Sequence, residues 1–174
     1  DQSEFIEAAI SEVQTAAVQG ALLAILVLYL FLRRARVTLI IAVTIPASVL
    51  ITFAMMRLFE ISLNVMSLGG IALAVGMLMD NAIVVLENIT RRRESGEGQK
   101  QASELGSSEV SGAVLASTLT TIAVFLPLAF VEGVAGQLFK DQALTVTFAL
   151  MASLLLATSL IPMLSALGAS AETV

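Results

Sequence analysis

Hydrophobic residues run through this chain in five long stretches that are separated by short polar segments. The stretches cover residues 16–32, 37–56, 61–90, 110–131 and 141–167. A bilayer core of about 30 Å is crossed by a helix of about 20 apolar residues. The pattern therefore predicts an all-α fold, a polytopic membrane bundle of about five transmembrane helices over residues 16–167, with short amphipathic helices at the interface.

The first 15 residues form an amphipathic lead-in to the first stretch. In a helix, its apolar residues share one face and its glutamates lie on another: Phe5, Ile6, Ala9, Ile10 and Val13 against Glu4, Glu7 and Glu12. Such a helix lies along the membrane surface from the periplasmic side or joins a soluble domain, and a plain surface helix fits equally well. Residues 168–174 are predicted to form a C-terminal tail.

The basic residues are distributed unevenly among the polar segments. Of the nine Lys and Arg residues, the first and third segments hold Arg33, Arg34, Arg36, Arg91, Arg92, Arg93 and Lys100, and the other two hold only Arg57 and Lys140. Cytoplasmic loops of membrane proteins carry the excess of Lys and Arg. This distribution predicts that loop 91–109 is cytoplasmic, that the N-terminus is periplasmic and that the C-terminus is cytoplasmic.

The amino-acid composition also indicates that the chain is surrounded by lipid. The chain is 57% hydrophobic and 13% charged, whereas soluble domains contain roughly 25% charged residues. A chain of 174 residues cannot bury so much apolar surface in its own core. Cysteine and histidine are both absent and no strongly basic segment occurs, so we expect a lipid bilayer around the chain and no metal, cofactor or nucleic acid bound to it.

Asp80 is the residue that breaks the hydrophobic pattern. It lies in the third stretch, 11 residues before Arg91, which places it roughly 16 Å from the cytoplasmic edge at 1.5 Å per residue. An ionised carboxylate at that depth is costly, and apolar surroundings favour its protonated form. Intramembrane ionisable residues are usually functional, so Asp80 is predicted to be a proton relay. A carboxyl locked in a hydrogen bond to a neighbouring helix is the alternative.

Two groups of polar residues could assist Asp80. Asn81 is turned about 100° from Asp80 around the helix and can form hydrogen bonds but cannot titrate. The fourth stretch has a hydroxyl cluster at residues 117–121, from which Thr118 and Thr121 are candidate hydrogen-bond partners. Membrane serines and threonines often bond to their own backbone instead.

Glu87 lies seven residues after Asp80, on nearly the same helix face, and four residues before Arg91. A Glu followed by Arg at this spacing favours an ion pair. We therefore expect an interfacial pair between Glu87 and Arg91, with a role for Glu87 in proton uptake as the alternative.

Small residues gather in the same stretch at Gly69, Gly70, Ala72 and Gly76. Ala72 and Gly76 are four residues apart, a spacing that lets membrane helices approach closely. The third stretch is therefore predicted to lie at the centre of a bundle and to use these residues for helix packing.

These residues resemble a known family. Residues 70–88, GIALAVGMLMDNAIVVLEN, resemble the fourth transmembrane helix of the resistance–nodulation–division (RND) efflux transporters. Residues 29–40 resemble the second helix with its cytoplasmic turn, and residues 124–130 and 158–162 resemble the fifth and sixth helices. The resemblance extends over nearly the whole chain and implies helices two to six of the N-terminal membrane half, without the first helix, the periplasmic modules or the second half.

The resemblance also implies a function. RND members are proton/substrate antiporters of the bacterial inner membrane that export drugs or other amphiphilic compounds, and they are not enzymes. They form homotrimers and can work with a periplasmic adaptor and an outer-membrane channel. The multidrug branch has two adjacent carboxylates on the fourth helix, with a lysine on the tenth as their partner. Asp80 matches the first carboxylate and Asn81 replaces the second, so the proton number and the subfamily stay open.

Two other classes of protein deserve comparison. A membrane scaffold or assembly subunit without transport of its own would share the helices, but it has no need of a carboxylate in the middle of the membrane. An intramembrane aspartyl protease requires two aspartates on facing helices, and Asp80 is the only aspartate deep within a stretch. The protease is therefore excluded, and Asp80 favours the transporter over the scaffold.

Overall fold

The computed structural model describes residues 2–167, and the predicted tail at 168–174 lies outside that range. The described residues form helices and no strand: α1 (Gln2–Leu32), α2 (Ala35–Leu58), α3 (Val65–Glu94), α4 (Gln99–Phe125), the 3₁₀ helix η1 (Leu126–Phe130), α5 (Val134–Thr158) and α6 (Leu160–Leu167). Five segments are long and apolar enough to cross a membrane. The predicted all-α fold with five candidate membrane helices is confirmed.

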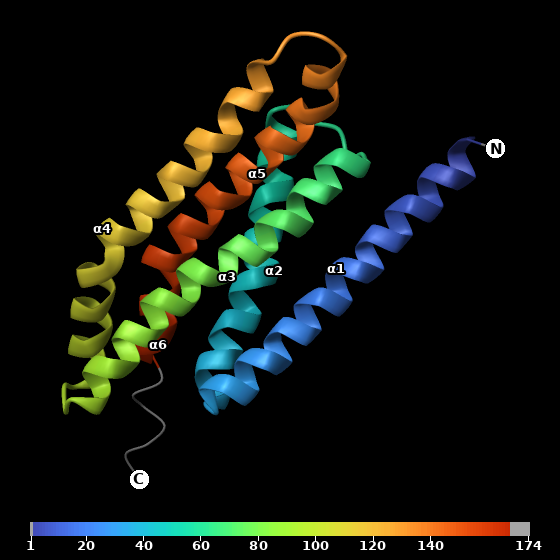
Figure 1. The fold of residues 1–174 in the computed structure, drawn as a ribbon. Helices are drawn as coiled ribbons and strands as arrows, with labels where there is room; N and C mark the ends of the chain where they lie inside the picture. Colours follow the sequence, from blue (N-terminus) through green and yellow to red (C-terminus); the bar gives the residue numbers. More distant parts are fainter. Residues whose placement is uncertain (1, 168–174) are drawn as a thin grey trace.

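The long helices alternate in direction and pack around α3 (Figure 1). α3 contacts α1, α2, α4, α5 and α6. α1 stands at one side of the bundle and diverges from its neighbours toward its N-terminal end (Figure 1). The sequence placed the third stretch at the centre of a bundle because it is rich in small residues, and α3 occupies that position.

The helices do not begin and end where the apolar stretches do. The lead-in and the first stretch form one continuous helix, α1. Most of the predicted loop 91–109 is also helical, because α3 continues to Glu94 and α4 begins at Gln99. A helix can continue past the apolar core of a bilayer, so its ends do not mark the membrane boundary.

Two of the three prolines change the local helix geometry. Pro127 lies in η1, where the regular helix of α4 gives way to a 3₁₀ turn. Pro162 lies in α6, just after the α-helix is interrupted at Ser159. A proline has no N–H to donate to the preceding turn, which explains both interruptions. Pro46 is accommodated inside α2.

Defined turn chemistry starts α3 and α5. Before α3, Asn64 Oδ1 accepts a hydrogen bond from the Ser67 N–H at 2.9 Å, and Ser67 Oγ accepts one from the Asn64 N–H at 2.9 Å. This reciprocal capping box satisfies two donors at the helix start. Before α5, Gly133 adopts a φ of +91°, which favours glycine.

The core lies between α3 and its neighbours. Ile41 of α2, Val85 of α3 and Ile161 of α6 are completely buried in one apolar cluster. Two buried threonines of α2 bond within their own helix: Thr44 donates to the Ile40 carbonyl at 2.6 Å, and Thr52 donates to the Ser48 carbonyl at 2.8 Å. Because lipid is as apolar as leucine, close packing and hydrogen bonds between helices must hold such a bundle together.

Candidate functional site

Asp80 lies near the midpoint of α3, 15 residues after Val65 and 14 before Glu94. Its side chain is exposed on the surface of the chain. Within residues 2–167, Asp80 forms no side-chain hydrogen bond and no ion pair. A mid-helix carboxylate that faces outward must meet water, a proton or another polypeptide segment, because lipid disfavours its charged form.

Asn81, unlike Asp80, faces into the bundle. Its side chain is 8% exposed, and Nδ2 donates to Thr118 Oγ1 of α4 at 3.0 Å and to Ser153 Oγ of α5 at 3.4 Å. Adjacent residues in a helix point about 100° apart, which allows the two polar side chains to occupy different environments. The structure therefore separates Asp80 from Asn81 by the rotation of α3.

The two predicted hydroxyl partners do not contact Asp80. Thr118 accepts the hydrogen bond from Asn81, and Thr121 Oγ1 donates to the carbonyl of Ser117 in its own helix at 3.0 Å. The physical reason is the orientation of α3, which directs Asn81 and not Asp80 toward α4. Ser153 is a polar contact that the sequence did not reveal, because a single serine in an apolar stretch carries no sign of its partner.

The expected ion pair between Glu87 and Arg91 is not formed. Arg91 donates to Asn88 Oδ1 at 2.5 Å and lies 3.8 Å from Glu109 Oε2. Asn88 in turn donates from Nδ2 to the Gly106 carbonyl and to Glu109 Oε2, each at 2.8 Å. Arg91 is drawn to this group of acceptors next to α4, whereas Glu87 lies exposed on the other side of α3.

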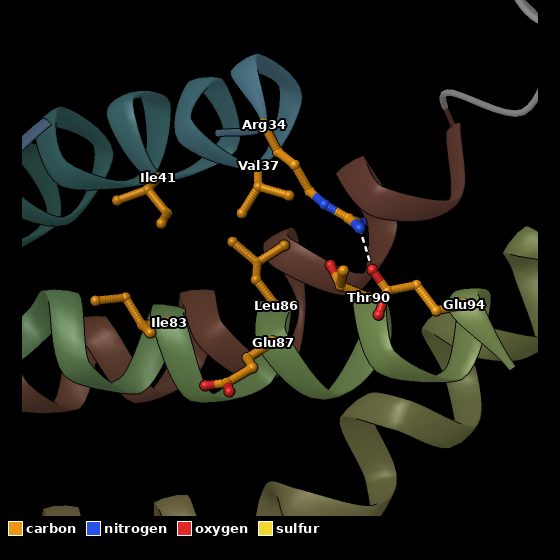
Figure 2. A pocket seen from close by; sticks show the side chains of 8 residues that line it. All are labelled: Arg34, Val37, Ile41, Ile83, Leu86, Glu87, Thr90 and Glu94. Atoms are coloured by element: carbon orange, nitrogen blue, oxygen red, sulfur yellow. Dashed lines mark hydrogen bonds and ion pairs between the residues drawn. The ribbon is translucent and has the colours of Figure 1, made fainter. Parts of the chain in front are cut away.

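Glu87 instead lines a cleft of about 300 Å³ between α2 and α3. Figure 2 shows Arg34, which immediately precedes α2, reaching Glu94 of α3, with which it forms an ion pair, while the Glu87 carboxylate lies away from that pair. Both partners of the ion pair are substantially exposed, so it adds little to stability. The cleft opens at the end of α3 that carries Arg91, Arg92 and Arg93.

The small residues of α3 serve two different surfaces. A Cβ added to Gly70 would lie 3.0 Å from the Gln142 carbonyl oxygen and 3.2 Å from Thr145 Cβ, so Gly70 packs closely against α5. Gly69, Ala72 and Gly76 instead line a groove of about 450 Å³ between α1 and α3. Gly76 lies one turn before Asp80, and a Cβ there would meet nothing within 4 Å.

The exposed face of α3 thus combines small residues with carboxylates. Along it lie Ala72, Gly76, Asp80 and Glu87, at spacings that keep them on one side of a helix. Among the described residues no group of three His, Cys, Asp or Glu side chains is placed to hold a metal ion. The chemistry that this face offers is proton binding at a carboxylate, next to a surface that permits close helix approach.

Comparison with known proteins identifies the class. Residues 1–172 match the model of the AcrB/AcrD/AcrF family, and the chain belongs to this RND family of secondary transporters; it is not an enzyme. It is 46% identical over 166 residues to the multidrug resistance protein MdtC of Pectobacterium carotovorum subsp. carotovorum (strain PC1), covering 95% of the chain. It is 43% identical over 164 residues to MdtC of Escherichia coli O139:H28, covering 94%. In each case the chain spans 16% of the relative's length.

Proposed function

We propose that this chain is part of the membrane domain of an RND proton/substrate antiporter and that Asp80 binds and releases the coupling proton. The observation that carries the proposal is the position of Asp80, at the middle of the central helix and on its outward face. Between Val65 and Leu86 of α3 it is the only charged residue. A scaffold helix would gain nothing from a carboxylate at this depth.

Protonation changes which surroundings the Asp80 side chain tolerates. When Asp80 is protonated it is neutral and tolerates apolar neighbours, whereas the carboxylate requires water, hydrogen-bond donors or a cation. Proton binding at one Asp80 oxygen therefore favours one arrangement of the surrounding helices, and proton release favours another. A protein that takes up the proton from one side and releases it to the other can drive such a change with the proton gradient.

The small residues near Asp80 allow a neighbouring helix to come close to α3. Ala72 and Gly76 leave the backbone of α3 accessible along the exposed face. A helix from the rest of the transporter can approach there closely enough to bring a donor or cation to Asp80. We propose that the second membrane half supplies this helix, since secondary transporters place their sites between two repeats.

The names of the relatives suggest the substrate, and the resemblance to the family suggests the assembly. The similar proteins are named multidrug resistance proteins, and we propose that the complete transporter exports drugs or other amphiphilic compounds from the bacterial inner membrane. A homotrimer that works with a periplasmic adaptor and an outer-membrane channel is the proposed assembly. Replacing Asp80 with Asn in the complete transporter tests the central role, because an amide of the same size cannot cycle a proton.

Topology can be tested directly on this chain, which has no cysteine. Ser95 follows α3, and Glu132 lies between η1 and α5 at the other end of α4; both are exposed. The uneven distribution of basic residues predicts that Ser95 is cytoplasmic and Glu132 periplasmic. Cysteines placed singly at these positions should react with an impermeant maleimide only from opposite sides. Labelling of both from the same side would disprove the proposed topology.

A further inference from the structure

Asn81 joins α3 to two neighbouring helices at the level of Asp80. Its Nδ2 group donates to Thr118 Oγ1 at 3.0 Å and to Ser153 Oγ at 3.4 Å. Ser153 Oγ also donates to the carbonyl of Leu78 at 3.5 Å, so α5 contacts α3 on both sides of Asp80 in the sequence. This polar cluster, Asn81, Thr118 and Ser153, is buried, and its hydrogen bonds are protected from competition with water.

The cluster contains no group that titrates. Asn, Ser and Thr side chains keep their protonation state at ordinary pH. No Asp, Glu, Lys, Arg or Tyr occurs in residues 110–131, 142–167 or 37–56, which include the parts of α4, α5, α6 and α2 that lie within the bundle. In the other two apolar stretches, residues 16–32 and 61–90, the titratable groups are Tyr29, Asp80 and Glu87. Proton binding at Asp80 therefore changes no charge within the cluster itself.

Other contacts hold α3 toward its two ends. Gly70 lies close to α5, and Asn88 donates to the Gly106 carbonyl of α4 at 2.8 Å. Between these points, the Asn81 cluster is where side-chain hydrogen bonds connect α3 with both α4 and α5. A rotation of α3 that moved Asp80 toward the interior would have to break these bonds and leave the buried Asn81 amide without partners, which is unfavourable.

We propose that Asn81 is a positioning residue for Asp80. Its hydrogen bonds to Thr118 and Ser153 fix the rotation of α3, so that Asp80 stays on the outward face in both of its protonation states. The bundle of α3, α4 and α5 then responds to the proton as one unit, and the movement occurs between this unit and the helices that cover the outward face. The inference rests on the proposed function of Asp80 as the proton-binding group.

The test measures the pH dependence of Asp80 in the complete transporter. A carbodiimide modifies protonated carboxyl groups, and mass spectrometry of the peptide that contains Asp80 gives the pH of half-maximal modification. Replacing Asn81 with Leu removes both hydrogen bonds, and replacing Thr118 with Val removes one of them. Either change frees α3 to rotate and so alters the surroundings of Asp80. Each variant should therefore change the midpoint by at least about 0.5 pH unit, where one pH unit corresponds to 1.36 kcal/mol.

Two matched controls separate positioning from general destabilisation. Thr120 lies on the same helix as Thr118 but is exposed and donates only to the Ala116 carbonyl, so Thr120→Val should leave the midpoint unchanged. Asn88 is a second buried asparagine of α3 with bonds to α4. Asn88→Leu should lower thermal stability without moving the midpoint. Thr118→Val is the milder change and keeps the test informative if Asn81→Leu does not fold.

A double-mutant cycle tests whether Asn81 influences the midpoint of Asp80 through its two hydroxyl partners. If Asn81 acts through its two hydroxyl partners, Thr118→Val with Ser153→Ala should reproduce the midpoint of Asn81→Leu, and adding Asn81→Leu should change it no further. An unchanged midpoint in Thr118→Val and Asn81→Leu overturns the positioning role. That result leaves the relay role intact as long as Asp80→Asn is inactive, and transport by Asp80→Asn removes the relay role itself.

Discussion

Asp80→Asn should abolish proton-coupled export by the complete transporter while leaving the protein inserted and folded. Asn has nearly the size of Asp and can still form hydrogen bonds, but it carries no proton that it can release. Asp80 forms no hydrogen bond or ion pair with other described residues, so the substitution removes no contact that stabilises this bundle. Export should fall to the level of cells without the transporter, measured as drug resistance and as proton-driven dye efflux at equal expression.

Glu87→Gln is the matched control for this experiment. It makes the same change of carboxylate to amide on the same helix and the same exposed face, two turns away. Glu87 lines the cleft beside α2 near one end of α3, where water can solvate its charge, so its loss should leave most of the export activity. Export by Asp80→Asn equal to that of the unmodified transporter would disprove the relay role, whereas loss of export in both variants would extend the proton route to Glu87.

The central helix and its carboxylate were predictable from sequence because their signals are local. A long apolar stretch has few alternatives to a membrane helix, and one charge in its middle stands out against the residues on either side. Ala72 and Gly76 predicted a surface for close helix contact, and in the structure they line a groove between α1 and α3. Each of these interpretations uses only the identity and spacing of residues along one helix.

The partners of the polar residues could not be predicted in the same way. Thr118 was expected beside Asp80, but it bonds to Asn81. The choice between two adjacent polar residues depends on how far α3 is rotated about its axis, and that rotation is set by packing against α4 and α5. Gly70 illustrates this: its close approach to Thr145 of α5 is invisible in the sequence, where Gly69 and Gly70 look equivalent.

The Glu87–Arg91 pair shows a second limit of local reasoning. The spacing of four residues favours an ion pair in an isolated helix by only about 0.2–0.5 kcal/mol. Contacts between helices easily contribute more than that amount. Here α4 brings Glu109 within 3.8 Å of Arg91, and Asn88 accepts a hydrogen bond from Arg91. Arg92 also lies 3.2 Å from Glu109. Because an arginine side chain is long and flexible, it forms its hydrogen bonds and ion pairs with the acceptors that lie near it in the folded bundle.

The contact between α3 and α4 also supports a prediction about stability. Gly106 of α4 packs against Ile89 of α3, and a Cβ added to it would lie 2.9 Å from the Ile89 Cα and 3.1 Å from the Ile89 N atom. Gly106→Ala should therefore push the two backbones apart and lengthen the bond from Asn88 to the Gly106 carbonyl. We expect a loss of about 1–3 kcal/mol in the free energy of unfolding, as for other overpacked contacts, measured by denaturant titration in detergent.

Gly112→Ala is the control, because it makes the same substitution in the same helix where a Cβ would meet nothing within 4 Å. Alanine favours the helix by about 0.8–1.0 kcal/mol relative to glycine, so this variant should be as stable as the original chain or slightly more stable. Helix propensity acts equally at both positions and close packing acts only at Gly106. Opposite changes in stability would therefore demonstrate the α3–α4 contact, and an equal gain in both variants would show that the two helices do not cross at Ile89 and Gly106.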